Sequence, residues 1–268
     1  VVVPSMPGYG WSEPFHKQHE GSVPNVARIF IQLMHGLGYN KYYAQGGDWG
    51  SIVAQCMARL DRKGCQGLHL NMLPCGPPRN SDGTELTTAD KKGLMKASMF
   101  QKYGIAYQNI HNTRPQTLSY GLNDSPVGLL AWTVEKFRDL SDCGGNVQSV
   151  FTNDQILTNV MIYWLTNSIG SSVRLYYESQ NVMPNTSQEL RDLASQYISQ
   201  PTACAQFPYD LYYGPKAWLM RTMNVQKYTL FESGGHFAAL EKPKVYVKDV
   251  KDFFLKEFVE GRGAEVEV

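Results

Sequence analysis

The sequence predicts an α/β fold in which a mostly parallel sheet is flanked by helices and interrupted by a long helical insertion. Short apolar runs alternate with helical repeats near both ends of the chain, which is the pattern of a parallel sheet with crossover helices. Residues 77–199 lack this alternation and show helical periodicity instead. We therefore expect a core formed by residues 1–76 and 200–268, and a helical lid formed by residues 77–199.

The composition is that of a globular protein without a nucleic-acid partner. The 268 residues are 43% hydrophobic, which is enough to fill a sizeable core. The formal net charge is +1 and the Lys and Arg residues are dispersed, so the sequence has no basic stripe for nucleic acid. Five cysteines without Cys-x-x-Cys spacing argue against a disulfide framework or a structural zinc site. A reducing, cytoplasmic location fits best.

The first strand is expected at the start of the chain. Val1-Val2-Val3 has the pattern of a buried strand, and a loop rich in Pro and Gly follows over residues 4–12. Loops at this end of parallel strands carry ligands in open α/β sheets. Because this strand is already under way at Val1, we expect the early strands to lie outside the given sequence. The sequence leaves membrane contact and a homodimer open.

The elements that follow the first loop alternate between helix and strand. Apolar positions at helical spacing predict a helix over residues 23–37, which Gly36 and Gly38 end. A strand over residues 42–45, a helix over 51–60 and a strand over 66–73 come next. In the insertion, helical periodicity covers residues 86–111, 127–137 and 156–177, and strands return at residues 202–207 and 228–232. A helix over residues 245–258 packs on the sheet.

The chain is organised around a turn with Asp48 at its tip. The segment from residue 42 to residue 54 reads as strand, glycine-flanked turn and helix, which is the context that a nucleophile elbow requires. Gly46 and Gly50 fill the two positions where larger residues would clash with the strand and the helix. A carboxylate at this position attacks a saturated, electrophilic carbon and forms an alkyl ester. The alternative is an ordinary turn in which Asp48 caps the helix.

Hydrolysis of such an ester needs a base and a carboxylate that orients it. His236 is the best candidate base, because it follows a predicted strand in a Gly-Gly-His turn late in the chain. Asp210 follows the preceding strand and occupies the place of the orienting acid. The alternatives are a surface turn for His236 and a helix cap or turn residue for Asp210.

Four blocks of sequence resemble the microsomal-type epoxide hydrolases, including their soluble fungal relatives. These blocks are Gly-Gly-Asp-Trp-Gly-Ser at residues 46–51, Asn-Asp-Ser-Pro-Val-Gly-Leu at 123–129, Phe-Pro-Tyr-Asp at 207–210 and Gly-Gly-His-Phe-Ala-Ala-Leu-Glu-Lys-Pro at 234–243. The resemblance covers residues 4 to about 258. It implies an α/β-hydrolase core with a helical lid, an epoxide substrate with water as the second reactant, and no cofactor or metal.

The resemblance also implies roles for individual residues. Asp48 is the nucleophile, Asp210 the acid and His236 the base. Two lid tyrosines bind the epoxide oxygen, and by position in their blocks these are Tyr107 and Tyr176, with Tyr177 adjacent to the second. A phenol suits this task because its pKa of about 10 lets it donate a proton to a developing alkoxide at neutral pH.

Trp49 follows the nucleophile, and its backbone N–H is expected to bind substrate as one half of the oxyanion hole. The family supplies the other half from a His-Gly-x-Pro segment upstream of the Pro-Gly-Tyr-Gly loop, and this sequence begins after that point. Haloalkane dehalogenases are the nearest alternative, since they share the fold and the Asp nucleophile but hold a halide with Trp and either Asn or a second Trp in place of tyrosines. A non-catalytic small-molecule binder with the same fold is the third hypothesis.

Overall fold

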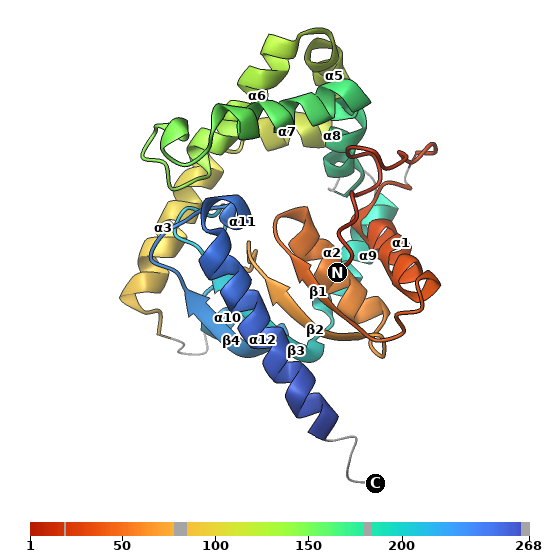
Figure 1. Cartoon of the computed structure of the whole chain (residues 1–268), viewed down its shortest axis with the longest axis vertical. Helices are drawn as coiled ribbons and strands as arrows, with labels where there is room; N and C mark the ends of the chain where they lie inside the picture. Colours follow the sequence, from red (N-terminus) through yellow and green to blue (C-terminus); the bar gives the residue numbers. More distant parts are fainter. Residues whose placement is uncertain (19, 78–84, 180–183, 264–268) are drawn as a thin grey trace.

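A parallel sheet with helices on both faces forms the centre of the protein (Figure 1). The structure is a computed structural model that describes residues 1–18, 20–77, 85–179 and 184–263. Within these residues the sheet runs in the order β1-β2-β3-β4, and each neighbouring pair is parallel. The strands are β1 (Tyr42–Gly46), β2 (Cys65–Leu70), β3 (Ile198–Gln206) and β4 (Met223–Leu230). The predicted fold class is confirmed.

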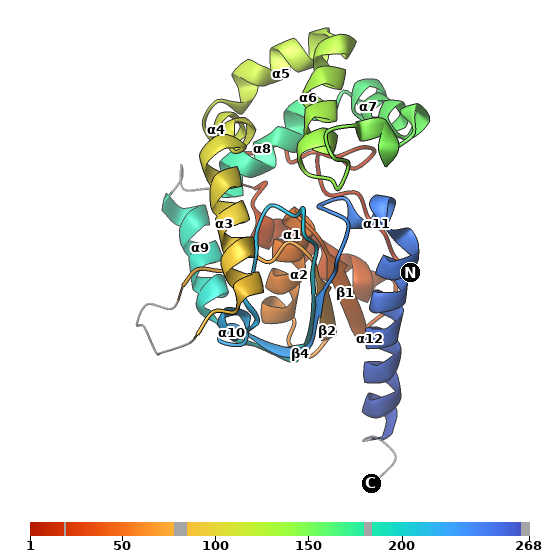
Figure 2. The same cartoon turned by 90° about the vertical axis from the view of Figure 1, so that its left-hand side faces the viewer.

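Alternate residues of the strands face two different helix layers. Ala44 and Leu68 are buried in the main core together with α2 (Trp49–Leu60) and α1 (Val23–Gly36). The neighbouring residues Tyr43 and His69 pack instead against Phe254 of α12 (Pro243–Gly263). Because side chains alternate along a strand, α2 and α12 cover opposite faces of the sheet, as Figure 2 shows. Short α10 (Lys216–Leu219) and α11 (Ala238–Glu241) follow β3 and β4.

Helices fill the chain between β2 and β3, as the sequence predicts. They are α3 (Thr88–Tyr103), α4 (Ala106–Thr113), α5 (Pro115–Asp124), α6 (Pro126–Asp139), α7 (Asn153–Thr166), α8 (Ile169–Ser179) and α9 (Pro184–Ser195), with a 3₁₀ turn at Val147–Ser149. Residues 78–84 and 180–183 of the expected insertion lie outside the described residues. Helices α5 to α8 share a small apolar core of their own and lie beyond one end of the sheet (Figure 1), whereas α9 packs on α1 and α2.

Local sequence explains where these helices begin and end. Thr87 and Thr152 each form a capping box, with Asp90 and Gln155 respectively, so α3 and α7 begin there. The single helix expected over residues 86–111 is two helices, because α3 ends at Tyr103 with Gly104 as its C-cap and α4 begins at Ala106. The sequence pattern did not reveal α5.

The prediction of a strand at Val1–Val3 is wrong. These residues have no strand conformation, and Val1 and Val3 are exposed. An apolar run becomes a strand only when its backbone pairs with a neighbour, and Val1–Val3 pairs with none of the four strands that the structure describes. The loop that follows lies against α8, where the Ser171 hydroxyl donates a hydrogen bond of 2.6 Å to the Gly8 carbonyl.

The turn between β1 and α2 has the strained backbone of an elbow. Asp48 has φ 51° and ψ −131°, a conformation that residues with a side chain rarely adopt. A Cβ on Gly46 would lie 2.0 Å from the Gly50 carbonyl oxygen, so only glycine fits there. The expected clash at Gly50 does not occur in the described structure: apart from its chain neighbours and the adjacent backbone of α2, no described atom lies within 4 Å of a Cβ built at that position.

These two glycines give a matched pair for a test of the elbow. Gly46→Ala should lower the free energy of unfolding by about 2 to 3 kcal/mol, because the new methyl group overpacks the turn. Gly50→Ala should change it by less than about 1 kcal/mol, since alanine favours the helix at an open position. Chemical denaturation of both variants measures the difference. Equal losses of stability in the two variants would contradict the close approach at Gly46.

Candidate active site

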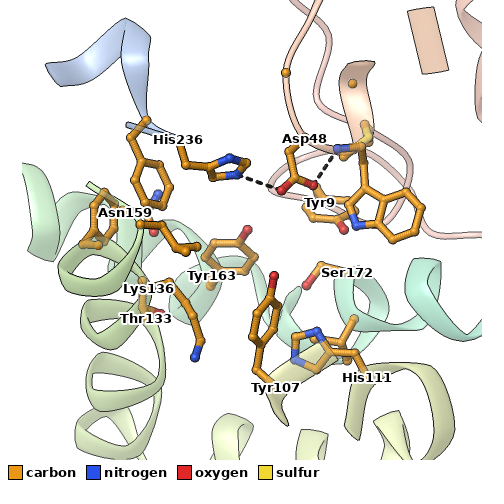
Figure 3. Close-up of a pocket in the computed structure, with 18 of the residues that line it drawn as sticks. Tyr9, Asp48, Tyr107, His111, Thr133, Lys136, Asn159, Tyr163, Ser172 and His236 are labelled. Atoms are coloured by element: carbon orange, nitrogen blue, oxygen red, sulfur yellow. Dashed lines mark hydrogen bonds and ion pairs between the residues drawn. The ribbon is translucent and has the colours of Figure 1, made fainter. Parts of the chain in front are cut away.

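Three side chains that follow three parallel strands meet at the carboxyl edge of the sheet. Asp48 comes after β1, Asp210 after β3 and His236 after β4. The Nε2 atom of His236 lies 2.8 Å from Oδ2 of Asp48, and its Nδ1 atom lies 2.7 Å from Oδ1 of Asp210. Figure 3 shows the first of these contacts. The structure therefore joins the three predicted triad residues by two hydrogen bonds.

Glycines let the loop that carries His236 approach its neighbours. Gly234 has φ +97°, a conformation that favours glycine. A Cβ on Gly235 would lie 2.5 Å from the Leu140 carbonyl oxygen, and this same oxygen accepts a hydrogen bond of 2.8 Å from the His236 backbone N–H. The Gly-Gly-His turn is thus packed tightly against the end of α6. His236 is not on a surface turn, because its side chain is 8% exposed.

The two carboxylates keep His236 protonated. Burial alone would lower the pKa of His236, but the charge and hydrogen bond of Asp210 and the contact with Asp48 raise it from its ordinary 6.5 to about 10. Burial would raise the pKa of Asp48, yet His236 and the Trp49 N–H outweigh that effect and lower it. The ion pair of Asp48 and His236 stabilises the fold fully between pH 3.8 and pH 6.5, the ordinary pKa values of the two groups. Its contribution is lost as the pH rises through about 10, and also as the pH falls through the lowered pKa of Asp48.

Asp48 and His236 face a cavity of about 540 Å³. Helices α4, α6, α7 and α8 line it from the side opposite the sheet, and the loop of residues 4–12 also contributes (Figure 3). Tyr107 on α4 and Tyr176 on α8 both line this cavity, with ring centroids 6.4 Å apart. Tyr177 is not among the residues that line it.

Both predicted tyrosines stay protonated. Burial, and next the negative charge of Asp48, raises the pKa of Tyr107 and that of Tyr176 above the ordinary value of 10. The Trp49 side chain packs edge-on against Tyr176, at 4.9 Å between ring centroids, and its hydrogen bond lowers the pKa of Tyr176 in part. Two neutral phenols can therefore donate hydrogen bonds into the cavity.

The backbone of Trp49 lies where the sequence places it. Its N–H donates a hydrogen bond to Oδ1 of Asp48, which makes Asp48 the N-cap of α2 as well as the partner of His236. The capping role that the sequence offers as an alternative thus accompanies the nucleophile geometry. An N–H that already contacts this carboxylate is well placed to stay with it when its charge changes.

The sequence did not identify several other residues that line the cavity. They are Tyr9, His111, Trp132, Thr133, Lys136, Asn159 and Tyr163. For Tyr9 a signal existed, because it lies in the loop after the expected first strand, where ligands bind. The others lie on helices whose periodicity indicates a buried face but not what that face contacts.

The described residues were also searched for a metal site and for a membrane-spanning helix. They contain no group of three His, Cys, Asp or Glu side chains that could hold a metal ion. None of the described helices combines the length and the apolar content that a bilayer-spanning helix needs.

A parallel sheet whose carboxyl edge carries a strained elbow and an acid–histidine pair defines an α/β-hydrolase. Residues 1–116 match the family profile described as alpha/beta hydrolase fold. The chain is 36% identical over 255 residues to a putative epoxide hydrolase of Stigmatella aurantiaca, and 36% identical over 277 residues to epoxide hydrolase 1 of Sus scrofa. These alignments cover 95% and 94% of this chain. The chain is thus similar to epoxide hydrolases of this fold over nearly its whole length.

Solved structures show the same similarity. The chain is similar to the epoxide hydrolase of Aspergillus niger at a TM-score of 0.80 and 33% identity, over 95% of this chain and 62% of that one. It is similar to the juvenile hormone epoxide hydrolase of Bombyx mori at a TM-score of 0.87 and 32% identity, over 98% of this chain and 64% of that one. The chain spans 56% of the Stigmatella relative and 59% of the Sus scrofa relative.

The contact between Asp210 and His236 can be tested by titration. Asp210→Asn should bring the pKa of His236 down from about 10, because the substitution removes the charge that raises it most. Asp249→Asn is the matched control, since Asp249 pairs with His69 at 2.9 Å on another side of the sheet. NMR titration of the imidazole of His236 in both variants gives the comparison. An unchanged His236 pKa in Asp210→Asn would rule out the pairing.

Proposed function

We propose that the protein hydrolyses epoxides to vicinal diols through a covalent ester on Asp48. The observation that carries this proposal is the convergence of Asp48, the His236–Asp210 pair and two neutral phenols on one cavity. The relatives reported above support it, because their names describe epoxide hydrolases. Asp210, His236, Tyr107 and Tyr176 take the roles that the sequence predicts for them.

In the first step, the carboxylate of Asp48 attacks one carbon of the epoxide ring. A C–O bond forms to Asp48 while the ring C–O bond breaks, and the released oxygen takes a hydrogen bond and then a proton from Tyr107 or Tyr176. Phenols with a raised pKa are still protonated at neutral pH, so they can donate. The lowered pKa of Asp48 keeps the nucleophile ionised.

The first step prepares the second. In the free protein His236 is protonated at neutral pH and cannot act as a base. Ester formation removes the negative charge of Asp48, which is one of the groups that raise the pKa of His236. The pKa of His236 then falls, and its proton passes to the tyrosinate left by the first step, which restores the phenol. The neutral imidazole takes a proton from water, and the hydroxide attacks the ester carbonyl while the Trp49 N–H stabilises the oxyanion. When the carbonyl forms again, the Asp48 ester oxygen leaves as an alkoxide and takes the acid proton of the new carboxyl group, which gives the diol and the Asp48 carboxylate.

Two other functions were open from the sequence. A haloalkane dehalogenase needs no phenols at the leaving group, yet Tyr107 and Tyr176 both line the cavity with Asp48. The comparisons name epoxide hydrolases at 32% to 36% identity, so the dehalogenase alternative is not favoured. A non-catalytic binder would have no need of a strained Asp48 paired with His236.

The ester intermediate is the direct test of the proposal. His236→Gln should still form the ester but not hydrolyse it, so the mass of the protein should rise by the mass of the epoxide. Asp48→Asn should form no ester and no diol while remaining folded. Rapid mixing followed by mass spectrometry measures the adduct. Substantial diol formation by Asp48→Asn would remove the central claim.

The tyrosines are tested by the rate of ester formation. Tyr107→Phe and Tyr176→Phe should each slow this step by roughly 30- to 1000-fold, because one hydrogen bond to the developing alkoxide is lost. The double variant should be essentially inactive, and hydrolysis of ester already formed should be unaffected. Stopped-flow measurement of Trp fluorescence times the two steps.

Tyr177→Phe is the matched control for the tyrosine test, because Tyr177 neighbours Tyr176 but does not line the cavity. It should form ester at the parent rate. If the Tyr177 variant slows while the Tyr176 variant does not, the second donor has been misassigned by one residue.

A further inference from the structure

The side of the cavity that belongs to α6 and α7 carries polar side chains that the proposed reaction does not use. Thr133 and Lys136 lie three residues apart on α6, so they share one face of that helix. Asn159 lies on α7, which packs against α6. All three line the cavity, and Figure 3 shows them on its helical side, away from Asp48.

Lys136 brings a positive charge into a mostly aromatic surrounding. Its Nζ lies 4.5 Å from the centre of the Tyr107 ring and 5.5 Å from that of Trp132, so cation–π contacts hold it toward the cavity. The side chain is 19% exposed. Its carboxylate partner is the adjacent Glu135, which is 55% exposed, and ion pairs with such an exposed group contribute little. Lys136 therefore retains donors for another anion.

The other groups near Lys136 do not compete for that role. His111 also lines the cavity, and burial, followed by the charge of Lys136, lowers its pKa to about 4, so it is neutral. Among the described residues that line the cavity, Lys136 and His236 are the cationic ones, and His236 is already held by two carboxylates. The side chains of Thr133 and Asn159 make no hydrogen bond to other described residues.

We propose that Thr133, Lys136 and Asn159 form a second binding site in the cavity, which takes a carboxylate group of the ligand. An ammonium, an amide and a hydroxyl supply hydrogen-bond donors, and the fixed charge of Lys136 selects an anionic oxygen over a neutral one. A cavity of about 540 Å³ has room for an apolar chain as well as the two polar groups. In combination with the proposed function, on which this part rests, the preferred substrates are epoxides that carry a distant carboxylate.

Ligand binding tests the site without relying on catalysis. Octanoate and 1-octanol, which share an apolar chain and differ in the charged group, are titrated into the protein by calorimetry. The parent should bind octanoate more tightly, and Lys136→Met should weaken octanoate binding by about 10- to 100-fold, as expected for loss of a charged hydrogen bond. Octanol binding should not change. Thr133→Val should weaken octanoate binding by about 2- to 10-fold.

Two further variants separate charge from packing. Lys136→Arg keeps the charge and should retain most of the affinity for octanoate. Lys102→Met is the matched control, since Lys102 also lies over a tyrosine ring, at 5.0 Å from Tyr103, but does not line the cavity. It should bind octanoate like the parent. Thermal unfolding of each variant identifies those that have lost the fold.

Turnover then links the site to the substrate. For an epoxide with a terminal carboxylate, Lys136→Met should raise KM by the same factor as it weakens octanoate binding. It should raise the KM for the methyl ester of the same epoxide by a much smaller factor. Equal binding of octanoate and octanol by the parent, or equal losses for both in Lys136→Met, would overturn the site. If octanoate binding depends on Lys136 but no epoxide is hydrolysed, the site stands and the proposed function fails.

Discussion

His236 lies between two carboxylates that would repel each other if it were absent. The three groups come from the ends of three strands, so their contacts depend on the register of the parallel sheet and on the loops that follow it. A buried ion triad of this kind is costly unless each charge has a partner. The imidazolium supplies partners for both carboxylates, and it becomes a base only once one of these charges has been removed. The same contact that stabilises the resting site therefore also fixes the order of the proposed steps.

Charged groups are distributed unevenly around the cavity. Asp48 and the imidazolium of His236 line its sheet side, and the buried Asp210 lies behind His236. The α6 side carries the ammonium of Lys136 beside aromatic rings. Neutral phenols also line the cavity, so the orientation of a bound molecule depends on where its oxygen atoms lie.

Local sequence patterns predicted more of the sheet and triad than of the cavity wall. Asp48 was predictable because the strand, the turn glycines and the helix lie within one short segment. Tyr107 and Tyr176 could be assigned only through the resemblance to a family, since a helical stripe rich in aromatic residues is more often part of a core than of a ligand pocket. Lys136 and Asn159 could not be predicted, because periodicity identifies the inward face of a helix but not its neighbour. The prediction of a strand at Val1–Val3 was wrong for a related reason, since pairing partners decide whether an apolar run becomes a strand.

Helix α8 belongs to two apolar cores at once. Val173 packs with the core shared by α5, α6 and α7, whereas Leu175 and Tyr176 pack with the main core under the sheet. Glu178 of α8 is 1% exposed and forms an ion pair with Arg174. It also accepts a hydrogen bond from the Gly21 backbone N–H, which connects α8 to the segment before α1. Tyr107 lies on α4, which packs against α8 but contributes no residue to the main core. Natural variation in α4 can therefore alter the gap between the two phenols, and in the proposed reaction the size of ring substituent accepted, while Asp48 stays in place.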